Sequence, residues 1–428
     1  MLVRSFVLRR ESIGVIVQEC VSGTIAVVRP EKALVNLFRS FIHKRIVEKE
    51  AAESEIKEVQ SYLNTLTDNL TYQQKKDEFL EYIQDYVNKA IVYSIPITAV
   101  EDFLLAQCAV LCSQAVAQSA HVEVIDGRDL VVCHQKEHTP VFDWTATCQE
   151  IERKCKGKSH LVIAGGYART PHGEVVGIGK GGANMMAALV ASALHAETLE
   201  FYVEGEGING ITSMTYDEAA HYCASKKAPF PSAALWPAKQ AGIPIMVKSI
   251  LHPEFAGTKI SFASEESDKE VSGIVVDQDL DLVTVYGTGL LGRVGASSAI
   301  FTALAKAGVN VRFIAQTSSE YSITFAVNVK DRETVTDVVN NLVVDNPLMP
   351  LDDVMVVNRE VAIVTVYGSR MKSRPGISGK VFSSLGEAGV SVIASAQGGE
   401  ELSISVVVEN ADIDKVQQAL SVLMNPER

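Results

Sequence analysis

The chain has 428 residues, enough for two or three domains, and 47% of them are hydrophobic while 21% are charged. This composition is typical of folded globular proteins and excludes a largely disordered chain. A formal net charge of −13 argues against a general binder of nucleic acid or of anionic membranes. No apolar run approaches the roughly 20 residues of a membrane-spanning helix, and seven scattered cysteines suit a reducing compartment. We therefore expect a cytoplasmic protein without a metal site.

The first part of the chain is predicted to form an α/β region. A strand is expected over 23–28, followed by a long charged helix over 31–63 and a second helix over 73–93. An apolar helix is expected over 97–115. It carries Glu101, an acid that is either a ligand-binding group or an ordinary solvated side chain.

Two glycine-rich turns follow in the middle of the chain. The strand expected over 161–164 leads into Gly165 and Gly166, and the segment 178–184 (IGKGGAN) opens a helix. Backbone amides at the start of a helix can hold a phosphate or a carboxylate, and Lys180 adds a positive charge. The glycines Gly179, Gly181 and Gly182 are also what a tight turn requires for its own sake, so this loop alone is a weak signal.

The last third of the chain is a tandem repeat. The segment 283–287 (VTVYG) recurs as 364–368, and at the same offset of 81 residues Gly295 meets Gly376 and Gln316 meets Gln397. Each copy predicts the order strand, helix, strand, strand, helix, which is close to the ferredoxin-like split pattern.

The repeat also offers a place for a small polar ligand. A strand-to-helix turn at Gly295 or Gly376 exposes backbone amides, which can hold a carboxylate. Gln316 and Gln397 end strands, where a carboxamide can donate and accept hydrogen bonds to an amino acid. The alternative is that both glutamines satisfy only the local backbone.

These segments carry a family resemblance. Each repeat resembles an ACT domain, most sharply in GVNVRFIAQTSSEYSITFAV and RPGISGKVFSSLGEAGVSVIASAQGGEELSISVVV, and the pair resembles the regulatory region of aspartokinases. The stretch from residue 160 resembles the amino-acid-kinase domain of that family, through IGKGGAN, EFYVEGEG, SMTYDEA and IPIMVKSILHPEFAGT. The segments look most like those of the threonine-sensitive aspartokinases that are fused to homoserine dehydrogenase.

The resemblance implies a fold and a set of site residues. It implies a three-layer, carbamate-kinase-like α/β domain over 1–262 and two ferredoxin-like ACT domains over 263–346 and 347–428. It also implies ATP and Mg²⁺ as cofactors if the kinase is active, and a homodimer formed through the ACT domains. Carried over to this sequence, the catalytic positions are Lys180 and Glu101. The positions for substrate and nucleotide are Gly165, Gly166, Gly179, Gly181, Gly182, Asn184, Glu204 and Lys227, and those for an effector are Gln316, Gln397, Gly295 and Gly376.

Several family positions are altered in this chain. The family begins with a strand leading into Lys-Phe-Gly-Gly-Thr-Ser, whereas here the lysine falls on Ser5 and the paired glycines are absent. Arg4 lies one residue out of register, so a strand points it to the opposite face. Lys180 replaces an arginine and Asn184 replaces an aspartate. The segment that covers the nucleotide in the family is deleted after Gly207.

Two main hypotheses remain from the sequence, beside a third in which the kinase domain is reused for another small acid or carbonyl substrate. In the first, the chain is an aspartokinase homologue with an eroded, weak or inactive kinase site and a preserved ACT pair that senses threonine or lysine. In the second, it is a working ATP:L-aspartate 4-phosphotransferase with a divergent site. Phosphoryl transfer depends on charge neutralisation and positioning, so the combined losses favour the first hypothesis.

Overall fold

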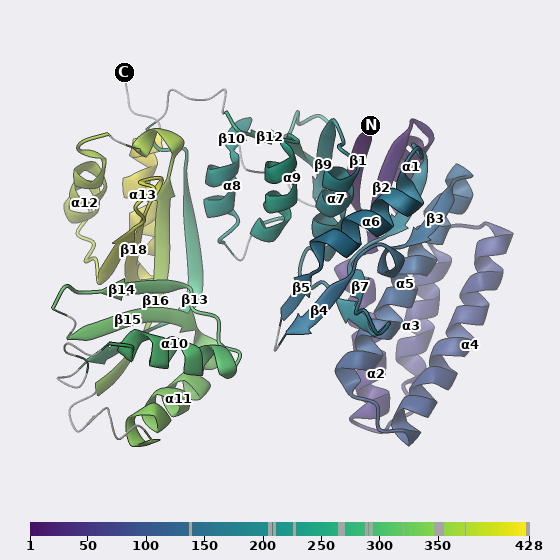
Figure 1. The fold of residues 1–428 in the computed structure, drawn as a ribbon, viewed down its shortest axis with the longest axis horizontal. Helices are drawn as coiled ribbons and strands as arrows, with labels where there is room; N and C mark the ends of the chain where they lie inside the picture. Colours follow the sequence, from purple (N-terminus) through teal and green to yellow (C-terminus); the bar gives the residue numbers. More distant parts are fainter. Residues whose placement is uncertain are drawn as a thin grey trace. The chain divides into compact units, whose positions relative to one another are not determined.

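The computed structural model forms two compact units. Unit 1 comprises residues 1–216 and 229–265, and unit 2 comprises residues 217–228 and 266–428. Both units combine sheets with helices (Figure 1). The structure describes residues 1–136, 139–203, 208, 211–225, 228–263, 270–286, 290, 294–319, 321–345, 355–372 and 374–424.

Unit 1 is built on an eight-stranded sheet in the order β10-β12-β11-β9-β1-β2-β6-β3. The six strands from β11 to β3 in this order pair in parallel with one another, whereas β12 is antiparallel to β11 and parallel to the edge strand β10. The strands of the sheet are β1 (Leu2–Leu8), β2 (Thr24–Pro30), β3 (Glu123–Asp126), β6 (Leu161–Ala164), β9 (Thr198–Val203), β10 (Ser213–Thr215), β11 (Ile245–Ser249) and β12 (Thr258–Ser261). Two hairpins, β4 (Cys133–Lys136) with β5 (Thr139–Phe142) and β7 (Tyr167–Arg169) with β8 (Val175–Gly177), lie outside the sheet.

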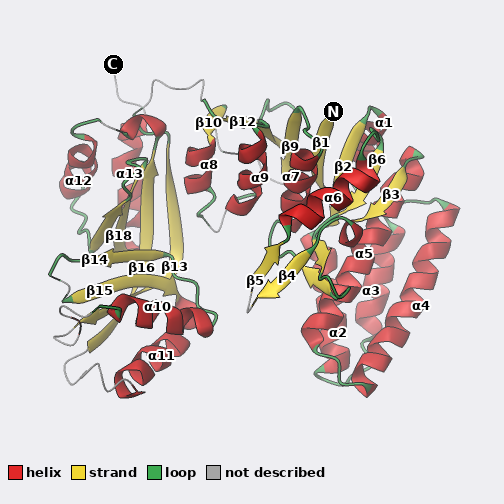
Figure 2. Ribbon diagram, viewed as in Figure 1, coloured by secondary structure: helices red, strands yellow, loops and turns green. Residues whose placement is uncertain are grey.

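Helices cover both faces of this sheet, which gives a three-layer α/β domain (Figure 2). One face packs against α1 and α5, and a large core joins it to α2, α3 and α4. The other face packs against α7, which in turn contacts α6 and α9. The helices are α1 (Ile13–Val21), α2 (Lys32–Ile46), α3 (Glu53–Asn64), α4 (Leu70–Val92), α5 (Ile97–Ala120), α6 (Trp144–Cys155), α7 (Gly182–Ala193) and α9 (Leu235–Ala241).

Two expectations for the helices were wrong. The single helix expected over 31–63 is two helices, α2 and α3, because the chain turns at 47–52 with Lys49 and Ala52 at positive φ. Lys44 then reaches back across this turn, with its Nζ 3.0 Å from Glu55 Oε1. Among the described helices, α5 is long and apolar enough to cross a membrane by length and composition, although no run of that length was expected. It is the core helix of unit 1, with 67% of its most apolar window buried.

Unit 2 contains a six-stranded antiparallel sheet in the order β14-β15-β13-β16-β18-β17. Helices α10 and α11 belong to the first repeat, and α12 and α13 to the second. The short helix α8 (Tyr216–Tyr222) starts at the last residue of the first segment of unit 1 and lies otherwise in unit 2. The remaining elements are β13 (Gly273–Tyr286), β14 (Phe313–Gln316), β15 (Ser322–Asn328), β16 (Met355–Tyr367), β17 (Ala394–Gln397), β18 (Ser403–Glu409), α10 (Ala296–Lys306), α11 (Arg332–Asp345), α12 (Ile377–Glu387) and α13 (Ile413–Met424).

The two repeats exchange strand halves. Residues 280–286 of β13 lie between β15 and residues 355–361 of β16, whereas residues 273–277 of β13 pair with residues 363–367 of β16. The register shifts between Asp277 and Leu280, with Asp279 at positive φ. Each repeat is thus a four-stranded, two-helix, ferredoxin-like module whose fourth strand comes from the other repeat.

Each module has its own core. Val283 and Val285 of β13 pack under α10 and α11, while Val364 and Val366 of β16 pack under α12 and α13. A third apolar cluster, including Leu282 and Phe313, fills the opposite face of the sheet, where β14 and β17 contact each other. Side chains alternate between the two faces of a strand. The apolar residues of β13 and β16 therefore contribute to a module core on one face and to the third cluster on the other.

Candidate functional site

A tight glycine junction lies at the carboxyl end of β6. The Gly165 amide donates to the Val28 carbonyl at 2.7 Å, and a Cβ added at Gly165 would lie 2.7 Å from Val27 Cγ1 and 3.0 Å from Ala183 Cβ. Gly166 has φ +103°, and its carbonyl accepts from the Ile178 amide at 3.0 Å. Only glycine fits this close approach of strand to helix.

The second glycine turn forms the start of α7. Gly179 and Gly181 adopt φ +88° and +74°, and Gly182 packs on Gly166, whose Cα would be 3.1 Å from an added Cβ. All twelve residues of α7 are buried, so its amino end is an electropositive group of amides in a low-dielectric setting. Lys180 is exposed at the tip of this turn. The structure therefore brings five of the predicted glycines and Lys180 together.

Asn184, in the first turn of α7, is hydrogen-bonded to β1. Ser5 Oγ lies 2.6 Å from Asn184 Oδ1, and both side chains are buried, with exposed fractions of 2% for Ser5 and 8% for Asn184. These are the positions at which the aspartokinase motifs carry a lysine and an aspartate. A neutral hydrogen bond stands here in place of two opposite charges.

Arg4 lies on the opposite face of β1, as its position in the strand predicts. Its Nε donates to Glu200 Oε2 at 2.5 Å and its Nη1 to Thr24 Oγ1 at 2.7 Å, and it also forms an ion pair with Glu19 of α1. Lys248 Nζ completes the group at 2.6 Å from Glu200 Oε1. Arg4 is thus neutralised on the α1 side of the sheet and does not stand in for the missing lysine.

Burial acts to raise the pKa of the Glu200 carboxyl, but the hydrogen bonds from Lys248 and Arg4 outweigh it and hold this pKa below its usual value. The carboxylate is therefore ionised at neutral pH. Its ion pairs with Arg4 of β1 and Lys248 of β11 link these two strands to β9, which carries Glu200.

The turn after β1 lacks the paired glycines of the family. Ser12 caps it: the Arg9 amide donates to Ser12 Oγ at 2.8 Å, and Ser12 Oγ donates to the Val7 carbonyl at 3.1 Å. Arg9 Nε lies 3.1 Å from Glu31 Oε2. This turn is closed by side chains rather than by a glycine loop with free amides.

Glu101, the second predicted catalytic residue, lies in the first turns of α5. Its Oε2 is 3.4 Å from Arg39 Nε of α2, and its side chain is 26% exposed. Both residues line a polar depression of about 480 Å³. Its described ion pair is with α2 and not with the α7 turn.

The neighbouring Asp102 makes that connection instead. Its Oδ2 accepts from the Gly177 amide at 3.0 Å, just before the α7 turn. Burial raises the pKa of the Asp102 carboxyl, against the opposing effects of the Gly177 amide and Arg39. Asp102 was not predicted from the sequence, because its partner is 75 residues away and no local pattern marks the pair.

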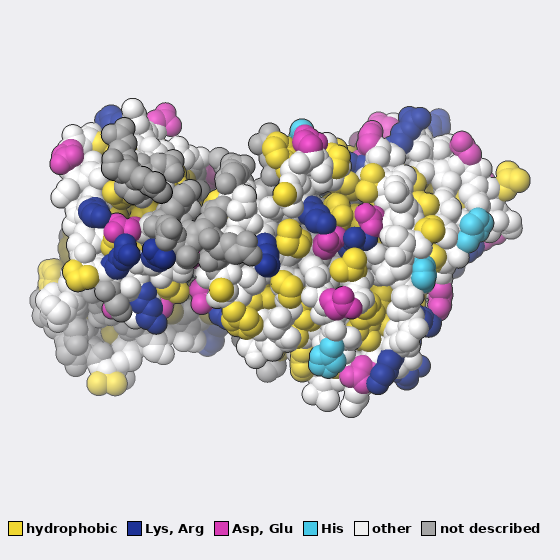
Figure 3. Space-filling view, turned by 90° about the horizontal axis from the view of Figure 1, so that it is seen from above, with side chains coloured by type: hydrophobic (Ala, Val, Ile, Leu, Met, Phe, Trp, Pro, Cys, Tyr) yellow, Lys and Arg dark blue, Asp and Glu magenta, His cyan; other side chains and the backbone are white. Residues whose placement is uncertain are grey.

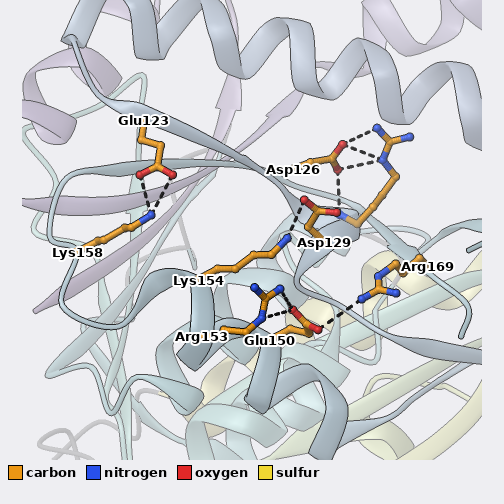
Figure 4. Close-up of polar contacts among 9 residues, drawn as sticks. Glu123, Asp126, Asp129, Glu150, Arg153, Lys154, Lys158 and Arg169 are labelled. Carbon is orange, nitrogen blue, oxygen red and sulfur yellow. Dashed lines mark hydrogen bonds and ion pairs between the residues drawn. The ribbon is translucent and has the colours of Figure 1, made fainter.

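Paired charges surround the edge strand β3 (Figure 4). Lys158 Nζ lies 2.7 Å from Glu123 Oε2, and Lys154 Nζ lies 2.8 Å from Asp129 Oδ2. Charged side chains of this kind protect an open sheet edge from pairing with another chain. Lys, Arg, Asp and Glu side chains are also interspersed on the face drawn in Figure 3.

In the part of the chain that the structure describes, no three His, Cys, Asp or Glu side chains form a cluster that could hold a metal ion.

The predicted effector positions of the repeat lie at corresponding places in the two modules. Gly295 and Gly376 both have φ +94° and precede α10 and α12, and Gln316 and Gln397 end β14 and β17 with exposed side chains. In the second module, Ser378 Oγ donates to Gln397 Oε1 at 3.3 Å. The glutamine is thereby placed beside the first turn of α12.

The strand pairings place the two glutamines apart. β14 runs in the same sense as β13, and β17 in the same sense as β16, whereas β13 and β16 are antiparallel. Gln316 and Gln397 therefore lie at opposite ends of the sheet, as two separate candidate sites. The predicted positions Glu204 and Lys227 lie outside the described residues.

Comparison with known protein families also separates a kinase region from two ACT domains. Residues 40–249 match the amino acid kinase family, and residues 283–342 and 364–422 each match the ACT domain. A bifunctional aspartokinase/homoserine dehydrogenase from Haemophilus influenzae is 30% identical over 303 residues, which are 65% of this chain and 37% of that protein. The aspartokinase of Bacillus sp. is 27% identical over 64% of this chain and 68% of its own length. The chain thus spans just over a third of the bifunctional relative.

Solved structures share the fold along the whole chain. The structure of Escherichia coli aspartokinase III in complex with aspartate and ADP, described as the R-state, has a TM-score of 0.81 at 17% identity and covers 99% of both chains. The same enzyme in complex with lysine and aspartate, described as the T-state, has a TM-score of 0.75 at 18% identity and covers 99% of this chain and 100% of its own. The three-layer kinase fold and the ACT domains predicted from the sequence are confirmed.

Proposed function

We propose that this aspartokinase-like chain, with its amino acid kinase region and two ACT domains, binds a regulatory amino acid at the ACT pair while its kinase site is weak or inactive. The observation that carries the second half of this proposal is the buried hydrogen bond between Ser5 and Asn184. The first half is supported by the two equivalent turn-and-glutamine sites of the repeat.

The neutral side chains of Ser5 and Asn184 matter because phosphoryl transfer depends on charge. Transfer of a phosphoryl group from ATP to a carboxylate requires cations and amides that neutralise charge on the moving group. The amides at the start of α7 remain, with Lys180 beside them, but β1 offers a hydroxyl that is already bonded to an amide side chain. Losing one such cation from a phosphoryl-transfer site can cost several orders of magnitude in rate.

Binding by the ACT pair follows from groups that suit an α-amino acid. A helix amino end receives a carboxylate, and a carboxamide oxygen accepts from an ammonium or hydroxyl group. Gly376 with α12 and Gln397 with Ser378 provide this combination, and Gly295 with Gln316 repeats it. We propose threonine or lysine as the ligand, in a cytoplasmic homodimer formed through the ACT modules.

The alternative is a working aspartate kinase that uses ATP and Mg²⁺ to make 4-phospho-L-aspartate. The preserved glycine junction of Gly165, Gly166 and Gly182 favours this alternative, since it keeps the start of α7, where a phosphate group could bind, packed against the end of β6. Glu101 and Arg39 would then lie on the acceptor side of the site.

A coupled assay of ADP release with aspartate, ATP and Mg²⁺ tests the proposal directly. We expect turnover at background level for the natural chain, and a rise for the double variant Ser5→Lys with Asn184→Asp, which restores the family charges. Turnover of a few per second in the natural chain would establish the alternative. Calorimetry with threonine, lysine and methionine tests the ACT pair separately, and absence of heat with every amino acid would overturn that half.

A further inference from the structure

The two candidate sites of the repeat differ in the side chains that lie next to their glutamines. In the second module, Ser378 Oγ donates to Gln397 Oε1 at 3.3 Å, so the first turn of α12 lies beside the end of β17. The helix ends at Glu387, before β17 begins at Ala394, so the helix and the strand run in opposite directions. The next residues along this surface are therefore one turn further in α12 and two positions back in β17.

Phe382 and Ser395 occupy these next positions in the second module. Phe382 lies four positions after Ser378, on the same face of the helix and about 5.4 Å further along its axis. Ser395 lies two positions before Gln397, on the same face of the strand and about 6.8 Å back. Both side chains are exposed, Phe382 by 39%. The second module thus presents an open aromatic ring next to a small side chain.

The first module has a larger side chain on its edge strand. At the offset of 81 residues, Phe301 and Ile314 take the places of Phe382 and Ser395. Ile314 is 49% exposed and lies on the same face of β14 as Gln316, two positions before it. Its branched side chain occupies the strand surface that Ser395 leaves open.

A difference in the core accompanies the difference in exposure of the two phenylalanines. Phe301 is only partly exposed, and its ring packs edge to face on the buried Phe325, with centroids 5.7 Å apart. The second module has Val406 at the position of Phe325, so Phe382 meets no aromatic ring there. The face of the Phe382 ring is available to a ligand.

The turns that follow the two glutamines differ in charge. In the second module, the carboxylate of Glu400 folds back against Gly398, the residue after Gln397. In the first module, Ser319 takes the place of Glu400, and its Oγ lies 2.9 Å from Thr317 Oγ1. A nearby negative charge favours a cationic ligand, and an ammonium group is also attracted to the face of an aromatic ring.

We infer that the two ACT modules select regulatory amino acids by their side chains, the first a short one and the second a long, cationic one. An amino acid whose polar groups are held at Gln397 reaches Phe382 only with a long side chain, which passes over Ser395. At Gln316 the same side chain collides with Ile314, whereas the short side chain of threonine stops before it. This inference rests on the proposed function, because it names the class of ligand for each of the two proposed sites.

Single-site variants of the whole chain test the selection by calorimetry. Gln316→Ala leaves the second site, and Gln397→Ala leaves the first. We expect the second site to bind L-lysine about tenfold more tightly than L-threonine, and the first site to prefer L-threonine by a similar factor. L-norleucine, which has nearly the length of lysine without its charge, should bind the second site roughly threefold more weakly than L-lysine.

Exchange of the two strand residues tests the cause of the selection. Added to Gln316→Ala, the change Ser395→Ile should remove the preference for L-lysine. Added to Gln397→Ala, the change Ile314→Ser should let the first site accept L-lysine. Both positions are exposed on edge strands, so the melting temperature should not change. Val422→Ser, at an exposed position of α13 in the same unit, is the matched control for Ile314→Ser and should alter no preference.

The possible outcomes separate the selection from the binding itself. Equal preferences in the two single-site variants, or preferences that ignore the exchange of Ser395 and Ile314, would overturn the inference, while the heat of binding would leave the proposed function standing. Absence of heat with every amino acid in the natural chain would overturn both. If an exchange variant melts early, the comparison of lysine, norleucine and threonine in the single-site variants still decides the inference.

Discussion

Asp281 and Arg332 form an ion pair that the first module has and the second lacks. Asp281 is fully buried, and its two oxygens accept from Arg332 Nε at 3.1 Å and Nη2 at 2.9 Å. Arg332 also lies between Asp281 and Glu360, two carboxylates that face each other across β13 and β16. The equivalent positions of the second repeat are Ala362 and Ile413, which are apolar.

Removing one partner of this pair is expected to destabilise unit 2. Arg332→Ala leaves the buried Asp281 carboxylate without its cation, and we expect the melting temperature of unit 2 to fall by about 5 °C or more. The double variant Asp281→Ala with Arg332→Ile copies the second module, so it should melt within about 2 °C of the natural chain. Calorimetric scans of the three proteins measure this difference, and equal losses in both variants would contradict it.

The charge state of the Ser5 and Asn184 positions can be tested by stability as well as by activity. Ser5→Lys alone places a cation at a buried position with no partner, and we expect it to cost roughly 3 kcal/mol in the free energy of unfolding. Adding Asn184→Asp should recover a large part of this loss, because it supplies the opposite charge. Urea titration followed by tryptophan emission reports on unit 1, and additive losses would show that the two side chains do not interact.

Acid should weaken unit 1 through Glu200. Its pKa in the folded chain lies below the unfolded value of about 4.3, so the stabilisation is complete above that value and is lost as the pH falls through the lower folded pKa. Lys248→Met removes one of the cations that lower this pKa, and the acid unfolding midpoint should move to higher pH. Urea midpoints at pH 7, 5, 4 and 3 measure the effect, and an unchanged pH dependence in the variant would contradict it.

Gly181 and Gly179 provide a matched pair of substitutions. Both have positive φ, so alanine at Gly179, which has open space around it, should cost about 1 kcal/mol from backbone strain alone. Alanine at Gly181 also collides with Pro231 and should cost clearly more. Chemical unfolding of both variants decides the comparison, and an equal cost would mean that Pro231 moves aside freely.

The two glutamines are expected to act independently. Gln316→Ala and Gln397→Ala should each remove one of two binding events for the regulatory amino acid, since the two residues lie at opposite ends of the sheet. Calorimetric stoichiometry measures this, with Gln278→Ala, on β13 in the same unit, as a control that should keep both sites. Loss of all binding from a single substitution would show instead that the glutamines share one site.

The sequence predicted the features that depend on local pattern. The repeat, its strand and helix order and the glycine turn before α7 are marked by spacing within short segments, and the opposite orientation of Arg4 follows from the alternation of a strand. The break between α2 and α3 was missed, because charged residues at 48–50 are equally compatible with an exposed helix surface.

Other features depend on contacts between distant segments. Ser5 meets Asn184 across 179 residues, and Glu218 meets Ser369 across 151. Neither pair has a local signature. The sharing of β13 and β16 was also not predictable, since a strand of 14 residues and two strands of seven have the same alternation.

The sharing of strands has a consequence for synthesis on the ribosome. The first repeat lacks its fourth strand until residues 355–361 have emerged, and the second cannot complete its sheet without residues 273–277, which were made long before. Neither repeat can finish folding first, so both close late and together through pairings between distant residues, which are slow to form. A nascent chain halted before β16 should therefore expose the edge of β13 and require a chaperone.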